Sequence, residues 1–144
     1  MTANLALGSF VIALTVLIYT LGLTIMSRAM AWLVAWLGLG AHGAGRHIAM
    51  VATVLCLFLI LTVEVWTWAA VYSASGIIAD FEEALYFSTV TFSTVGYGDV
   101  TPPHAWRLFC SLEGVNGFLL IGWSTAYLVS ASIRHGPFRI GEHF

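Results

Sequence analysis

The sequence predicts an all-α membrane protein with three transmembrane helices. Hydrophobic residues make up 60% of the 144 residues and charged residues only 8%, and the mean hydropathy is +0.93. Soluble domains are about 45–50% apolar and about 25% charged, so this chain has too little polar surface to remain in water. Three apolar segments reach the roughly 20 residues that a membrane-spanning helix needs; they are residues 5–26, 48–72 and 106–130.

The first segment is expected to be a retained helix rather than a cleaved signal peptide. No positive residue precedes it, and its apolar run exceeds the roughly 7–15 residues of a signal sequence. The apolar stretch 29–39 that follows is too short to cross a membrane and is bounded by glycines. We expect it to lie at the interface, with Trp32 and Trp36 at headgroup depth. Residues 1–47 are therefore interpreted as a transmembrane helix plus an interfacial segment.

The charges predict an orientation in the cell membrane. Arginine near a helix end is retained on the cytoplasmic side. Four of the five arginines fall on the same side of the membrane: Arg28 and Arg46 flank the connection between the first two spans, and Arg134 and Arg139 follow the last span. Four of the seven acidic residues lie together between the second and third spans: Asp80, Glu82, Glu83 and Asp99. We expect an external N-terminus, an external acidic segment and a short cytoplasmic tail at residues 131–144. Trp66, Trp68 and Tyr72 then fall at the outer interface.

Several function classes are not expected. The chain has no basic run, which argues against a nucleic acid partner. Cys56 and Cys110 lie in apolar runs without a zinc-ligand spacing, so we expect buried free thiols. The sequence shows no catalytic nucleophile together with a general base, so an enzyme is not expected. No helix carries arginine at every third position, as the helix of a voltage sensor does.

The connection between the second and third spans, residues 77–103, is too apolar for a solvent loop and too interrupted for a full span. Residues 84–92 predict a short helix whose amino end is favoured by the preceding carboxylates. The glycine-rich segment 94–99 comes next. Irregular backbone at membrane depth is tolerated only where it is buried in protein or lines a water-filled path, so we expect a re-entrant loop.

The segment 94–99 matches the signature of a potassium channel filter, which here consists of Thr94, Val95, Gly96, Tyr97 and Gly98 followed by Asp99. In such filters the carbonyl oxygens of four identical loops replace the hydration shell of the ion. Through this motif the pore domain, residues 48–130, resembles the potassium channel family, with an outer helix, pore helix, filter and inner helix. The resemblance implies a homotetramer, K⁺ as the permeant ion and no cofactor.

The resemblance also implies roles for individual residues. The carbonyls of Thr94, Val95, Gly96 and Tyr97 and the hydroxyl of Thr94 would bind K⁺, and Gly96 and Gly98 can adopt the backbone angles that this requires. Tyr97 would pack against Tyr86 and Phe87. Val90 stands where proton-gated bacterial channels that inactivate carry a glutamate paired with the filter aspartate. Asp99 lacks that partner, which leaves Trp106 or a water.

In the predicted inner helix, Gly117 falls at the family's hinge position, and Gly122 is a second candidate. A glycine in a membrane helix also permits close packing, so both interpretations stay open for these two residues. By the same resemblance Phe118, Ile121 and Thr125 would line the central cavity, and their spacing places them on one stripe of the helix.

Two carboxylic acids and one asparagine within the predicted spans need an explanation. Glu113 and Asn116 share a helical face that points away from the cavity, toward the pore helix or the outer helix. We favour a bracing role for Glu113, through a serine or threonine of the pore helix, over a role in gating. Glu64 either pairs with Arg107 or reaches the headgroups by itself.

The sequence therefore predicts a homotetrameric channel subunit that passes K⁺ passively. The alternative is a non-conducting or modulatory membrane subunit that keeps the pore fold. A potassium transporter is disfavoured because the chain carries a single filter motif rather than four. With so short a tail, we expect the opening stimulus to come from membrane lipids, tension, pH, the first helix or a separate regulatory subunit.

Overall fold

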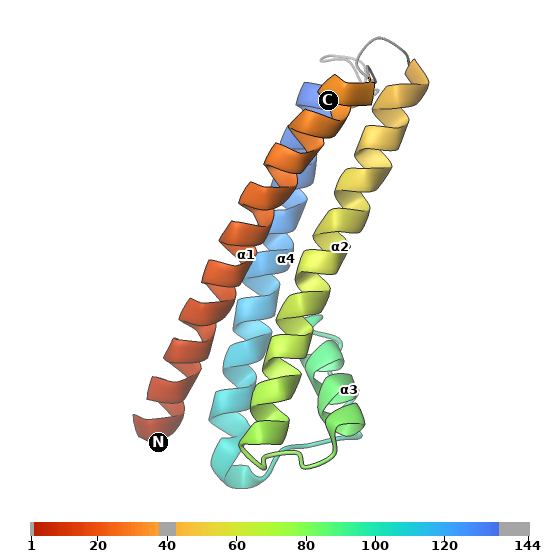
Figure 1. Cartoon of the computed structure of the whole chain (residues 1–144). Coiled ribbons are helices and arrows are strands. Elements are labelled where there is room, and N and C mark those ends of the chain that lie inside the picture. Colours follow the sequence, from red (N-terminus) through yellow and green to blue (C-terminus); the bar gives the residue numbers. More distant parts are fainter. Residues whose placement is uncertain (1, 38–42, 136–144) are drawn as a thin grey trace. The chain divides into compact units, whose positions relative to one another are not determined.

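The computed structural model describes residues 2–37 and 43–135, and this part of the chain is helical without a strand. The elements are α1 (Thr2–Leu37), α2 (Gly43–Ala74), α3 (Phe81–Phe92), the 3₁₀ turn η2 (His104–Trp106) and α4 (Arg107–His135) (Figure 1). Every helix predicted from the sequence is present.

Two of the described helices are apolar and long enough to cross a membrane. These stretches are Asn4–Leu33 within α1 and Gly45–Ala74 within α2. The third expected span lies in α4, whose 29 residues extend over about 44 Å at 1.5 Å per residue, enough to cross the hydrocarbon core. α4 is less apolar than α1 and α2 and is not one of the two helices above, so its crossing of the membrane stays a prediction.

Helix α1 is longer than the sequence analysis predicted. It continues from Met26 through Ala29 to Leu37 without a break, whereas a separate segment was expected from residue 29 onward. The reason is local, because residues 27–37 contain neither glycine nor proline and are mostly good helix formers. Trp32 and Trp36 stack on each other with ring centroids 5.6 Å apart. Their position at the membrane interface stays a prediction.

The described residues form two compact units, which we describe separately. The first contains residues 2–19 and 61–121, and the second contains residues 20–37, 43–60 and 122–135. The first unit includes α3 and the segment with the filter motif. In the second unit Gly22 of α1 lies against Ile60 of α2.

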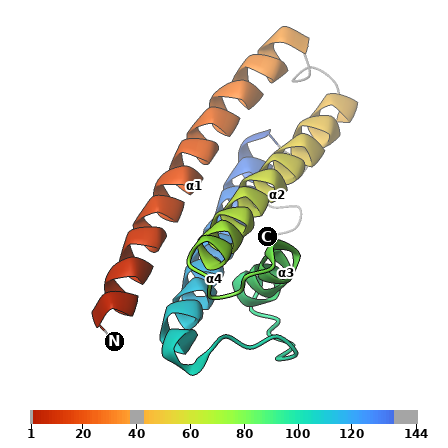
Figure 2. The same ribbon diagram turned by 60° about the horizontal axis from the view of Figure 1, so that its bottom comes forward.

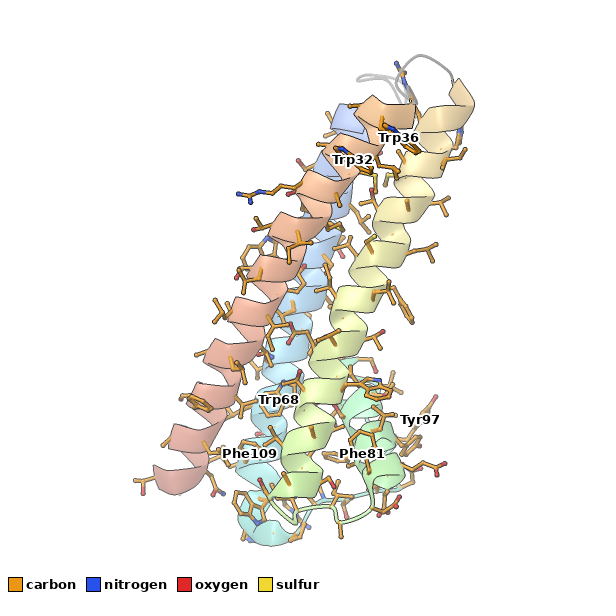
Figure 3. All side chains as sticks on the ribbon, in the orientation of Figure 1. Trp32, Trp36, Trp68, Phe81, Tyr97 and Phe109 are labelled. Carbon is orange, nitrogen blue, oxygen red and sulfur yellow. The ribbon has the colours of Figure 1, made fainter. Side chains whose placement is uncertain are left out.

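An aromatic cluster forms the core of the first unit. Trp68 and Tyr72 are fully buried, and both rings contact Phe109 of α4, at centroid distances of 5.5 and 5.8 Å. Figure 3 shows Trp68 and Phe109 between the helices. Trp68 and Tyr72 therefore pack inside the protein, and the position of the three aromatic residues at the outer interface stays a prediction. Only Trp66 is exposed, and it contacts Phe81 edge to face.

Within the first unit α1 packs along α4. Gly8 lies against Leu112, and a Cβ at Gly8 would approach the Leu112 Cδ1 atom to 2.4 Å. Further along, the Asn116 side chain donates a hydrogen bond of 2.9 Å to the buried Thr15 hydroxyl. Asn4 donates to the carbonyl of Ala105. The first helix is thus held by one polar bond to α4 and one to η2, on either side of its close contact with Leu112.

Candidate functional site

Helix α3 confirms the predicted short helix and is three residues longer at its amino end, while its role as a pore helix stays a prediction. Asp80 is its N-cap and accepts a hydrogen bond of 2.9 Å from the backbone N–H of Glu83. Glu82 and Glu83 occupy the first turn, where negative charge is favourable. The helix lies beside the last turns of α2, since the Ser88 hydroxyl donates to the carbonyl of Val65 at 2.9 Å (Figure 1).

The backbone of the filter motif alternates in handedness. Thr94, Gly96 and Gly98 have positive φ angles of 62°, 56° and 77°, while Val95 and Tyr97 between them do not. In an extended strand successive carbonyls point in opposite directions, whereas alternating left- and right-handed residues allow them to face one side. The two glycines therefore adopt the conformation that the sequence analysis expected of them.

Thr94 is the residue whose conformation the sequence did not indicate. A residue with a Cβ in the left-handed region costs about 1–2 kcal/mol, and such strain is characteristic of functional sites. Two hydrogen bonds hold the segment at the end of α3: the Thr94 N–H donates to Thr91 and the Gly96 N–H donates to Val90, each at 3.0 Å. Figure 2 shows the chain continuing from here to α4 as an extended loop.

The side chains of the motif point away from the body of the single chain. Tyr97 is 72% exposed and Val95 is 53% exposed, and Figure 3 shows Tyr97 beyond α3. Phe87 is buried against Tyr72, with centroids 5.3 Å apart. The packing of Tyr97 against Tyr86 and Phe87 stays a prediction for the assembled protein.

Asp99 has a partner that the sequence analysis did not assign to it. The Tyr86 hydroxyl donates a hydrogen bond of 2.6 Å to Asp99 Oδ2. Trp106, which was expected to compete with water for this role, packs edge to face on Phe109 instead. Val90 is buried, so this position contributes apolar packing here, whereas proton-gated bacterial channels that inactivate carry a glutamate there.

The Tyr86 hydrogen bond changes the acidity of both groups. It lowers the pKa of Asp99 below its usual value, because the bond favours the charged carboxylate. The same bond raises the pKa of Tyr86 above its usual value, because it must be broken for the phenol to ionise.

Removing the Tyr86 hydroxyl should therefore make Asp99 easier to protonate. In Tyr86→Phe we expect the pKa of Asp99 to rise toward that of an ordinary aspartate. The charged carboxylate is favoured at higher pH and is lost as the pH falls through its pKa, so this loss should begin at a higher pH in the variant. Carboxyl-carbon NMR titration of Asp99 measures the effect. The control is Tyr127→Phe, which removes a tyrosine hydroxyl in the other unit; an equal Asp99 titration in Tyr86→Phe and wild type would contradict the prediction.

Behind the pore helix Glu113 joins three helices. It is fully buried in α4, with Tyr72 Oη of α2 2.5 Å from Oε2 and Ser88 Oγ of α3 2.5 Å from Oε1. The expected hydrogen bond between Glu113 and a hydroxyl of α3 is confirmed, while a bracing role rather than a role in gating stays a prediction. Tyr72 was not expected to take part, because the sequence alone placed it at the membrane interface.

Asn116 and Gly117 contact different elements. Asn116 bonds Thr15 of α1, not the pore helix or outer helix, so that expectation is wrong. A Cβ at Gly117 would lie 2.1 Å from the carbonyl oxygen of Phe92, whereas one at Gly122 would meet nothing within 4 Å. Close packing therefore accounts for the glycine at position 117.

The predicted cavity residues lie on the outer surface of the single chain. Phe118 is 68% exposed in the first unit, Ile121 is half-buried there, and Thr125 is exposed in the second unit. Their role in lining a cavity stays a prediction. Within residues 2–37 and 43–135, no group of three His, Cys, Asp or Glu side chains could hold a metal ion. Cys56 and Cys110 are free thiols; Cys110 is buried as expected, whereas Cys56 is only half-buried.

Neither interpretation of Glu64 is correct. Its side chain is fully buried, and no described group bonds either of its carboxylate oxygens. Arg107 is exposed at the start of α4. Because the polarity of a residue does not reveal the rotation of its helix, the sequence could not show that Glu64 faces inward.

Comparison with known proteins supports a channel. A family model described as "Ion channel" matches residues 58–134, which contain the end of α2, all of α3, the filter motif and most of α4. An uncharacterized membrane protein, YdjJ, of Bacillus subtilis (strain 168) is 30% identical over 113 residues, which covers 67% of this chain and 33% of that protein. The chain thus spans about a third of the length of this curated relative. No solved structure matches the chain. The chain belongs to the membrane ion-channel family of the two-transmembrane-helix type, which includes potassium channels.

Proposed function

We propose that the protein is a potassium-selective channel subunit that passes K⁺ passively through the segment 94–98. The alternation of backbone handedness at Thr94, Gly96 and Gly98 carries the proposal. It orients successive carbonyl oxygens toward one side, as a row of K⁺ ligands requires. The oxygens of Thr94, Val95, Gly96 and Tyr97 then replace the water around the ion.

The pore helix supports the same function. The carboxyl end of a helix carries a partial negative charge, because its last carbonyls have no partner within the helix. In α3 this end lies next to the filter motif, since the Thr94 and Gly96 N–H groups bond carbonyls of its last turn. A cation near the carboxyl end of α3, next to the filter motif, is therefore stabilised by the partial negative charge of that helix end.

We infer that four copies assemble around the pathway, since one loop supplies a quarter of each oxygen ring. The exposed Val95, Tyr97 and Phe118 supply the surfaces that neighbouring copies and the pore would cover. In this arrangement α1, α2 and α4 all cross the cell membrane. The N-terminus and the acidic residues of α3 lie outside and the end of α4 faces the cytoplasm.

Ion flux into liposomes that contain the purified protein tests this function. We expect uptake of K⁺ and Rb⁺ far above uptake of Na⁺, with block by Ba²⁺. Equal permeation of Na⁺ and K⁺ would overturn the selectivity. Intact protein that passes no cation under any pH or tension would instead favour a non-conducting subunit.

The replacement Gly96→Ala should reduce K⁺ flux severely. Its φ of 56° costs a residue with a Cβ about 1–2 kcal/mol, or about 4–8 kcal/mol over four copies. The filter is expected to relax to another conformation, with loss of selective Rb⁺ uptake. Gly122→Ala is the matched control, since that position is helical with open space around it. Rb⁺ uptake by Gly96→Ala at the wild-type level would contradict the assignment of residue 96 to the ion path.

A further inference from the structure

Glu64 and Trp68 leave buried polar atoms without a partner. Of the described side chains, only three buried nitrogen or oxygen atoms have no hydrogen-bond partner: Oε1 and Oε2 of Glu64 and Nε1 of Trp68. Both side chains are fully buried. They lie four residues apart in α2, so they are neighbours on one helical face. An unused donor therefore lies one turn from two unused acceptors.

No cation of the first unit balances Glu64. Its described arginine, Arg107, and its described histidine, His104, are both exposed. The other titratable groups on the elements of this unit are Tyr19 on α1, Tyr72 on α2, Asp80, Glu82, Glu83 and Tyr86 at α3, Tyr97 and Asp99 in the loop, and Cys110 and Glu113 on α4. None of these carries positive charge, and the nearby Tyr72 and Glu113 already bond each other.

Because Glu64 is fully buried within one chain, neither a lipid headgroup nor a neighbouring subunit can reach it. Removing a carboxylate from water without a counter-ion costs several kcal/mol. In such places the group takes up a proton and becomes neutral. A protonated carboxyl still needs hydrogen-bond partners, as does the indole N–H of Trp68.

We propose that Glu64 and Trp68 form a proton-binding site. Glu64 holds the proton as a neutral acid, and one water molecule accepts hydrogen bonds from the Trp68 indole N–H and the Glu64 O–H and donates one to the other Glu64 oxygen. The ligand is a proton taken from water, and no other reactant is needed. The site satisfies all three atoms that the protein itself leaves without a partner.

The site has a consequence for conduction, and this consequence rests on the proposed channel function. Trp68 packs against Tyr72, with centroids 6.1 Å apart, and Tyr72 holds the Glu113 carboxyl that also bonds the pore helix. Loss of the proton places an unpaired charge beside this cluster. Since a buried charge has to be hydrated, the packing of Trp68 must open. Alkaline pH should therefore loosen the support of the filter.

Infrared difference spectroscopy of the protein in lipid bilayers tests the site. At neutral pH we expect a C=O band of a protonated carboxylic acid in wild type that is missing in Glu64→Gln. The matched control Glu82→Gln removes an exposed carboxylate and should leave the band unchanged. Glu113→Gln identifies any second protonated acid. A wild-type spectrum without the Glu64 acid band would overturn the proposal.

Two further measurements keep the test decisive. Should Glu64→Gln not fold, Glu64→Asp retains an acid whose band is expected at a shifted frequency, and an unshifted band would assign it elsewhere. The infrared result is independent of ion flow, so it stands whether or not the protein conducts. In flux assays, wild-type Rb⁺ uptake should fall from neutral to alkaline pH more than that of Glu64→Gln. Equal pH dependence of the two would overturn the coupling.

Discussion

Gly117→Ala should prevent the pore helix from reaching its position against α4. The added Cβ would lie 2.1 Å from the carbonyl oxygen of Phe92 and 2.9 Å from its Cα, and backbone atoms cannot move aside as a side chain can. Overpacking a buried contact costs about 1–3 kcal/mol and sometimes more. We expect a lower melting temperature of the protein in detergent and loss of Rb⁺ uptake in liposomes.

Gly122→Ala is again the matched control, because it adds the same methyl group to the same helix where nothing lies within 4 Å. It should melt at or slightly above the wild-type temperature, since alanine favours helix more than glycine does. If Gly117 served only as a hinge, Gly117→Ala would keep its melting temperature and change gating alone. That result would contradict the packing argument.

The elements of the fold were predictable because each follows from a local property of the chain. Apolar length predicts the long helices, and the acidic residues before residue 84 predict where a short helix begins. The positive φ angles of Gly96 and Gly98 follow from the absence of a Cβ. The boundaries were less accurate: α3 begins three residues earlier than predicted, and continuous good helix formers extend α1 beyond its predicted span.

The pairing of polar residues was not predictable in the same way. Asn116 and Thr15 are 101 residues apart in the sequence, and their bond depends on where α1 packs. Tyr86 and Asp99 are closer, but their contact depends on the path of the loop after the filter motif. Glu64 was misjudged because composition does not give the rotation of a helix about its axis. Burial of these groups is a property of packing rather than of residue type.

Glu113→Leu should destabilise the protein, while Glu113→Gln should not. The Ser88 hydroxyl has one hydrogen but lies within bonding distance of both Glu113 and the carbonyl of Val65. All groups are satisfied when a neutral Glu113 donates to Ser88, Ser88 donates to Val65, and Glu113 accepts from Tyr72. A glutamine reproduces this pattern, since its NH₂ group donates and its carbonyl accepts.

Leucine removes both functions and deprives the fully buried Tyr72 hydroxyl of its carboxyl acceptor, which leaves only the weaker Cys110 thiol beside it. An unsatisfied buried group costs about 1–3 kcal/mol, which amounts to about 4–12 kcal/mol over the four copies of the proposed assembly. We expect Glu113→Leu to lower the melting temperature in detergent and to abolish Rb⁺ uptake, with Glu113→Gln close to wild type in both. If glutamine were as damaging as leucine, the network would require a charged carboxylate. A wild-type melting temperature for Glu113→Leu would instead show that α3 is held by the Ser88 contact to α2 and by apolar packing alone.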